Sequence, residues 1–176
     1  FGRACRLEIR VASLDTDSVT LRLWARVWSP VIPTELTHDA WRKLALPGEP
    51  DVLEPAFNSA FHHGAPTPTV SLLLHHSLNL AGDGTREEWM RVMAWLGLQY
   101  GDVRLPPDHL AVACEVMSVA VERSEDLICS GLAERYLLPW CQVAVERLDT
   151  AGNGLVELPR RFAQALDHIT ADVASP

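Results

Sequence analysis

The sequence predicts an all-α protein, and three observations lead to that prediction. Apolar residues recur at helical spacing along nearly the whole chain. No alternating pattern long enough for a strand interrupts them. The 176 residues, 48% of them hydrophobic and 22% charged, have the composition of a soluble domain and are enough to bury one core. We therefore expect a single domain over residues 1–176, folded as a bundle of about eight or nine helices.

The first half of the chain contains four predicted segments. In 21–28, apolar side chains fall on one helical face, and the Ser29-Pro30 pair that follows ends the helix. A short helix is predicted over 37–46, closed by a proline and a glycine. A weaker helical pattern covers 54–61. After a break rich in proline, the apolar stretch 70–80 runs to a pair of glycines.

The second half gives stronger helical patterns. Thr85-Arg86-Glu87-Glu88 has the spacing of a capping box and predicts a helix that begins at Thr85. A loop follows over 101–107, and Ser124-Glu125-Asp126 is the predicted cap of a later helix. Pro139 lies inside that helix and predicts a kink or a restart. The predicted core faces hold Trp89, Val92, Met93, Leu96, Leu110, Cys114, Met117, Val121, Leu132, Tyr136, Trp140, Val143, Ala144, Phe162, Leu166 and Ile169.

The charge balance narrows the classes of partner. A formal net charge of -8 argues against nucleic acid and favours a basic ligand, such as a peptide that bears arginine. The same acidity also serves solubility alone. The longest apolar runs, such as 70–74, are too short to span a bilayer, so we expect no stable membrane insertion.

The N-terminus and the cysteines indicate the compartment. Phe1-Gly2-Arg3-Ala4-Cys5 is followed by no apolar stretch of the kind that a secretion signal carries, and the missing initiator Met leaves the true start open. The four cysteines form no Cys-x-x-Cys pair and match no zinc pattern. We interpret them as structural thiols in a reducing, cytoplasmic setting.

The most unusual local pattern is Pro106-Pro107-Asp108-His109. One interpretation is a helix start, with Asp108 as its cap and His109 on the surface. The other is a loop that presents both side chains to a groove. Glu115 follows seven residues after Asp108, which places it near the same helical face, where both acids would meet a cationic ligand. Trp140 is predicted to lie in the core rather than against a ligand.

Other chemistries find no support in the sequence. The histidine doublets at 62–63 and 75–76 point their rings in different directions on a helix, so neither doublet easily chelates one ion. Gly82-Asp83-Gly84-Thr85 lacks the lysine and the spacing of a phosphate-binding loop. No serine or cysteine nucleophile has a base nearby in sequence. We expect no metal, no cofactor and no catalytic residue.

Several motifs together are similar to those of a known family. Tyr100 stands in a loop ahead of Pro107-Asp108-His109-Leu110, and Glu115-Val116-Met117 and Tyr136-Leu137-Leu138-Pro139-Trp140 follow. This series resembles the motifs of the TorD/NarJ (DMSO reductase maturation) chaperone family. Segment 21–30 resembles the first helix of that family. The chain departs from the pattern at Ala113, where the family has an acid, and at Tyr136, where it has a histidine.

The resemblance implies a TorD-like all-α fold and a cytoplasmic, non-catalytic chaperone. Such a protein binds the apo form of a molybdenum-cofactor oxidoreductase catalytic subunit, often through its twin-arginine leader, and holds it until the cofactor is inserted. By this resemblance, the residues that bind the client or its signal peptide are Tyr100, Pro107, Asp108, His109, Glu115 and Trp140. The chaperone would carry no cofactor and would be a monomer or a dimer that exchanges helices.

Two other functions remain open at this point. An unrelated helical interaction module would place its largest apolar groove away from 100–110. A helical enzyme would use Asp108 and His109 as an acid-base pair, and would need a third polar group that converges on a closed pocket.

Overall fold

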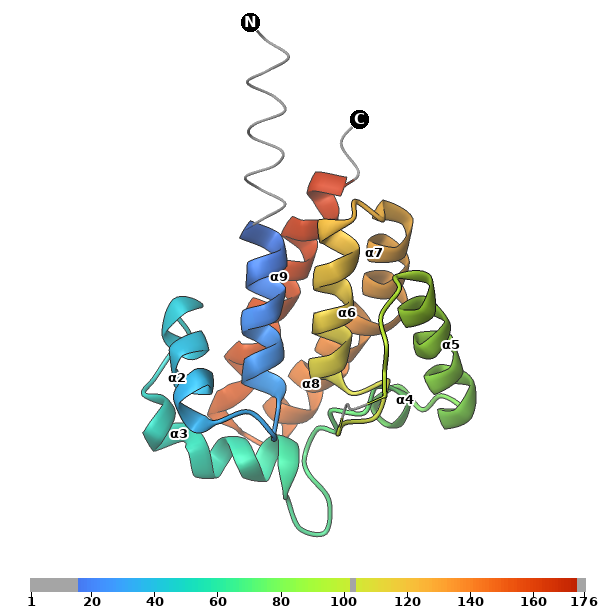
Figure 1. Cartoon of the computed structure of the whole chain (residues 1–176). Coiled ribbons are helices and arrows are strands. Elements are labelled where there is room, and N and C mark those ends of the chain that lie inside the picture. The colour runs from blue at the N-terminus through green and yellow to red at the C-terminus, as the bar shows by residue number, and fades with distance from the viewer. Residues whose placement is uncertain (1–15, 102–103, 174–176) are drawn as a thin grey trace, which may run out of the picture.

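The computed structural model describes residues 16–101 and 104–173, and within these ranges the protein is an all-α bundle (Figure 1). Residues 16–28 are helical. The later elements are α2 (Thr34–Lys43), α3 (Pro50–Phe57), a π-helical turn (Asn58–His62), α4 (Leu74–Ser77), α5 (Gly82–Trp95), α6 (Leu110–Glu122), α7 (Asp126–Leu132), a second π-helical turn (Ala133–Leu137), α8 (Leu138–Thr150), a 3-10 turn (Gly154–Val156) and α9 (Glu157–Val173).

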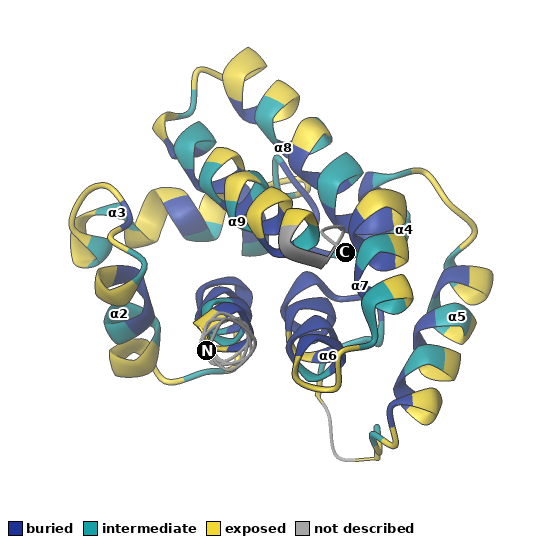
Figure 2. Cartoon of the chain, turned by 90° about the horizontal axis from the view of Figure 1, so that it is seen from above, coloured by how far each residue is buried: buried dark blue, intermediate teal, exposed yellow. Residues whose placement is uncertain are grey.

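The core lies where the 16–28 helix meets α8 and α9. Viewed from above, the 16–28 helix and α6 stand side by side in front of α8 and α9 (Figure 2). Trp24 and Trp28 stack at 5.4 Å between ring centroids. Trp28 meets the edge of Trp140 at 5.4 Å, and Trp24 contacts Phe162 at 5.1 Å. Large aromatic rings from three helices thus fill the centre of the bundle.

Two flanks are added to this centre on opposite sides. Helices α2 and α3 form one flank, and α5 forms the other (Figures 1 and 2). Trp41 of α2 packs against Phe57 of α3 at 6.2 Å, with the two rings nearly perpendicular. Trp89 of α5 packs against Tyr136 at 5.5 Å. Phe57 in turn stacks on Trp28 of the 16–28 helix at 6.2 Å. Each flank therefore attaches to the rest of the fold through buried aromatic rings.

The core faces predicted from helical spacing are confirmed except at Val92 and Val143, which are only half-buried. On α6, the predicted stripe of Leu110, Cys114, Met117 and Val121 is at most 2% exposed. The predicted stripe of α9, which consists of Phe162, Leu166 and Ile169, is equally buried. Of the six tryptophans, five lie in the core, whereas Trp95 at the end of α5 is 71% exposed. No helix among the described residues has the length and apolar character that a membrane span requires.

Two predicted helix starts are wrong by three residues. Helix α2 begins at Thr34 rather than Thr37, directly after Pro33. Helix α5 begins at Gly82, so Thr85 lies inside its first turns and its hydroxyl donates to the Ala81 carbonyl at 3.0 Å. Asp83 places a carboxylate near the positive end of the helix dipole, which favours this earlier start. The capping box at Thr85 is not formed.

The predicted interruption at Pro139 is confirmed. Helix α7 passes into the π-helical turn at 133–137, and α8 starts at Leu138 with Pro139 in its first turn. A proline is tolerated there because the first helical positions need no backbone donor. A single π-helical turn inside a helix is one recognised cause of a break in its regular hydrogen-bond pattern.

Candidate functional site

The Pro106-Pro107-Asp108-His109 segment forms a turn ahead of α6 rather than its first turn. The His109 amide donates to the Pro106 carbonyl at 2.9 Å, and α6 begins at Leu110. His109 is the N-cap, and its Nδ1 accepts a hydrogen bond from the Ala111 amide at 3.2 Å. The expected cap at Asp108 and the expected surface position of His109 are both wrong, because Asp108 is 0% exposed and His109 only 6%.

Asp108 is held by partners from two other helices. Its Oδ2 lies 2.5 Å from Nδ1 of His75 in α4, and it also accepts from the His75 amide at 3.2 Å. Its Oδ1 lies 3.4 Å from Nε of Arg86 in α5. A buried carboxylate is stable only with such compensation. We call Asp108, His75 and Arg86 the Asp108 cluster.

Backbone contacts fasten the same region. The Leu74 amide donates to the Asp108 carbonyl at 3.0 Å, and the Leu110 amide donates to the Leu72 carbonyl at 2.8 Å. Trp140 Nε1 donates to the Ser71 carbonyl at 2.9 Å. The Pro-Asp-His-Leu motif and the Leu-Pro-Trp motif therefore both attach to segment 71–75, although they are far apart in the sequence.

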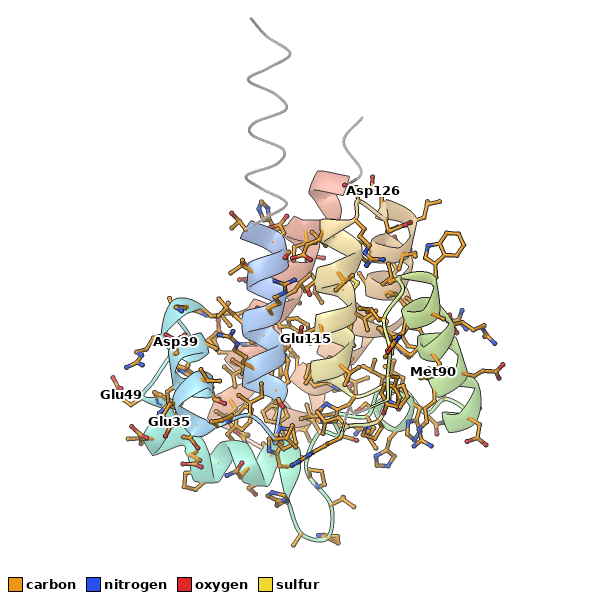
Figure 3. All side chains as sticks on the ribbon, in the orientation of Figure 1. Glu35, Asp39, Glu49, Met90, Glu115 and Asp126 are labelled. Atoms are coloured by element: carbon orange, nitrogen blue, oxygen red, sulfur yellow. The ribbon has the colours of Figure 1, made fainter. Side chains whose placement is uncertain are left out.

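The remaining predicted site residues occupy different places. The Tyr100 hydroxyl donates to the Leu105 carbonyl. Pro107, two residues further along the chain, is half-buried. Trp140 is 0% exposed in the core, as the sequence predicts. Glu115 is exposed on the outer side of α6 (Figure 3).

The electrostatic neighbours of Glu115 differ from those of Asp108. Partial desolvation raises the pKa of Glu115, opposed by Arg22 and Arg26 of the 16–28 helix. The partners of Asp108 come instead from α4 and α5. The structure therefore does not join Asp108 and Glu115 in one ligand site.

An open pocket lies on the opposite flank. It has a volume of about 240 Å³ and is bounded by the end of the 16–28 helix, the residues that follow it, α2, α3 and the π-helical turn at 58–62. Its apolar walls are formed by Val27, Ile32, Trp41, Leu53 and Phe57. Trp41 is held in place by a hydrogen bond from its Nε1 to the Gly48 carbonyl at 3.1 Å. We call this space the α2–α3 pocket.

Polar groups line the rest of the α2–α3 pocket, and one of them is unusual. His62 Nε2 is buried and has no hydrogen-bond partner in the described part of the chain. The ring lies close to the backbone of Trp28. Burial first, and then His63, lower the pKa of His62 to about 4, so the ring is neutral near pH 7.

The flank that carries this pocket is rich in acids. Glu54 lines the pocket, and Asp51 lies 3.5 Å from Nδ1 of His38, another lining residue. Glu35, Asp39 and Glu49 lie on the same flank (Figure 3). Asp39 is neutralised by Lys43 at 2.8 Å and approached by Arg26 at 4.0 Å.

Comparison with known proteins adds no assignment. No family model, no curated protein and no solved structure matches this chain. Among the residues that the structure describes, no group of three or more histidine, cysteine, aspartate or glutamate side chains is arranged to hold a metal ion.

The sequence interpretation missed His75, Arg86 and His62. His75 and Asp108 are 33 residues apart, and no local pattern marks them as partners. His62 is conspicuous in the sequence only as half of a histidine doublet. One feature of the sequence hints that His62 is buried. It ends an amphipathic stretch directly before a break, and such a stretch has to pack against its neighbours.

Proposed function

We propose that this protein is a non-catalytic, cytoplasmic chaperone that binds an apo molybdenum-cofactor oxidoreductase subunit. It binds the client through its twin-arginine leader and keeps it competent for cofactor insertion. The observation that carries the proposal is the attachment of both resembling motifs to segment 71–75. The residues that resemble the TorD/NarJ motifs therefore meet in space in this chain.

The geometry offers little to an enzyme built on Asp108 and His109. The Asp108 carboxylate is directed to His75 and Arg86, while His109 caps α6. Burial lowers the pKa of His109 to about 4, assisted by the nearby His62 and opposed by Asp108. A general base needs a reachable proton and a pKa near the working pH, and a buried imidazole used as a cap provides neither.

The charge of the chain suits the proposed ligand. A net charge of -8 attracts a leader that carries adjacent arginines and raises the rate of encounter. In this proposal, Asp108 fixes the frame of the motif region and does not touch the client's arginines. Its oxygens are already occupied by internal donors.

A second candidate, an unrelated helical interaction module, has two observations in its favour. The α2–α3 pocket lies away from residues 100–110, which is what such a module predicts. Trp95 is 71% exposed and Leu127 is 89% exposed. Large exposed apolar side chains of this kind are common at protein interfaces. Such a module would bind a folded surface through these residues rather than a leader peptide.

Affinity capture tests the proposal. The tagged protein is expressed in its native cytoplasm, and captured proteins are identified by mass spectrometry. We expect the catalytic subunit of a molybdoenzyme, and we expect its loss when the two arginines of the client leader are replaced by glutamine. Capture of other proteins only, or capture that persists without the leader arginines but is lost in a Trp95→Ser, Leu127→Ser variant, would support the interaction module instead.

A further inference from the structure

The turn between α8 and α9 contains the pair Asn153-Gly154. Gly152, just before it, has a φ of 63°, in the left-handed region that ends many helices. The Asn153 amide donates to the Leu148 carbonyl at 2.9 Å, and the 3-10 turn that leads into α9 begins at Gly154. The pair therefore lies where one helix ends and the next begins, in a turn held by local hydrogen bonds.

An asparagine followed by a glycine has a reaction of its own. The backbone nitrogen of the glycine attacks the carboxamide carbon of the asparagine, a new C–N bond closes a five-membered succinimide ring, and the side-chain nitrogen leaves as ammonia. Water then opens the ring at either carbonyl, which gives aspartate or isoaspartate. Glycine favours the attack because it has no Cβ to crowd the nitrogen. The reaction needs water only.

The surroundings of Gly154 are open. A Cβ placed on Gly154 or on Gly152 would have nothing within 4 Å. Gly154 is also the first residue of its 3-10 turn, a position whose amide has no acceptor within the helix. Of the other two asparagines, Asn58 precedes a serine inside a π-helical turn and Asn79 precedes a leucine. Asn153 therefore has the least hindered neighbour for ring closure.

The folded structure opposes the same reaction through a cap. Asn153 Oδ1 accepts a hydrogen bond from the Leu155 amide at 2.9 Å, which fixes the carboxamide at the start of the 3-10 turn. The ψ angle of Asn153 is 123°, and ring closure needs a large rotation about ψ to bring the Gly154 nitrogen next to the side chain. The cap must therefore open before the ring can close.

We propose that Asn153-Gly154 is a deamidation site whose rate is set by the opening of this cap. The aspartate product keeps an acceptor in the same place and adds a negative charge near the positive end of α9, so it strengthens the cap. The isoaspartate product inserts a methylene group into the backbone and displaces the start of α9. Because Phe162 of α9 contacts Trp24 at 5.1 Å, that displacement weakens the core.

The first experiment follows the reaction in the intact chain. Purified full-length protein is incubated for several weeks at neutral pH, and its asparagines are monitored by peptide mass spectrometry beside a synthetic peptide of sequence 150–157. We expect Asn153 to convert faster than Asn58 and Asn79 but more slowly than in the peptide. Conversion no faster than at the other two asparagines would overturn the site. Conversion as fast as in the peptide would overturn the role of the cap.

Two matched variants test the attacking nitrogen. Gly154→Ala has room for its methyl group, so it keeps the fold, and it is expected to slow the conversion of Asn153 several-fold. Gly131→Ala, at a glycine in α7 with equal room, is the control and should convert at the wild-type rate. An unchanged rate in Gly154→Ala, or equal slowing in both variants, would contradict the proposal.

A third variant tests the consequence for stability. Asn153→Ser keeps a capping oxygen and removes the carboxamide. Its melting temperature should match that of freshly purified wild type and stay constant on storage, whereas the fraction of stored wild type that carries isoaspartate should melt lower. Equal melting temperatures for the isoaspartate fraction and the fresh protein would contradict the proposed effect on α9.

Discussion

The Asp108 cluster and the α2–α3 pocket are opposites in how their polar groups are satisfied. In the cluster, a fully buried carboxylate has three donors within 3.4 Å, from His75 and Arg86. Among the residues that line the pocket, His62 carries an imidazole nitrogen that is buried with no partner from the described residues. Satisfied buried groups stabilise one conformation, whereas a buried group without a partner costs stability. The most conspicuous motif in the sequence therefore contributes to the framework of the fold.

The largest expected effect comes from breaking the Asp108 cluster. Asp108→Ala leaves the His75 amide and the Arg86 head without their acceptor, so we expect the free energy of unfolding to fall by about 3–5 kcal/mol. Urea denaturation measures this loss. Asp149→Ala, at an exposed position late in α8, is the control. A loss below about 1 kcal/mol for Asp108→Ala would mean that the cluster is not a structural element.

The next effect is a loss of stability in acid. Burial keeps His109 neutral in the folded protein, with a pKa of about 4 against an ordinary value of 6.5. The unfolded chain takes up that proton between these values, so the contribution is complete above pH 6.5 and declines as the pH falls toward 4, by about 3 kcal/mol.

Denaturation at a series of pH values checks this prediction. His109→Asn keeps a good N-cap and removes the titration, so its stability should depend less on pH between 4 and 6.5. Parallel profiles for the variant and the wild type would contradict the assignment.

A smaller effect is expected from the hydrogen bond that joins Trp140 to segment 71–75. Trp140→Phe removes the donor to the Ser71 carbonyl, which keeps its second donor from the Ser77 hydroxyl at 2.6 Å. With the lost ring volume, we expect a cost of about 1–3 kcal/mol by urea denaturation. No effect on the proposed client capture is expected beyond this loss of stability, because Trp140 is 0% exposed.

The smallest effect on stability is expected at His62. His62→Phe replaces an unpartnered buried nitrogen by carbon, so its unfolding free energy should change by less than about 1 kcal/mol or rise slightly. A clear loss of stability in this variant, measured by urea denaturation, would show that His62 serves the fold.

The limits of sequence reasoning follow from the range of the interactions involved. The buried stripe of Leu110, Cys114 and Met117 was predictable because helical spacing is a local property. The restart at Pro139 was predictable for the same reason. The role of Asp108 was not, because the local preference of an acid for a helix start competes with donors 22 and 33 residues away.

The pocket was beyond prediction for a related reason. Its walls come from four separate elements and the residues that connect them, and nothing in 27–63 marks their junction as open. His109 illustrates both cases. Its position at a helix start is a local property and was predictable, whereas its burial depends on the packing of segment 71–75 against it.

The stacked indoles of the core have an optical consequence. Trp24 and Trp28 lie 5.4 Å apart with planes 13° from parallel, and Trp140 meets Trp28 at 5.4 Å with planes at 69°. Chromophores this close share their electronic excitations, so the near-ultraviolet circular dichroism of this protein should be strong and dominated by these rings. Because the rings come from two helices at the centre of the bundle, that signal reports directly on whether the two helices remain docked.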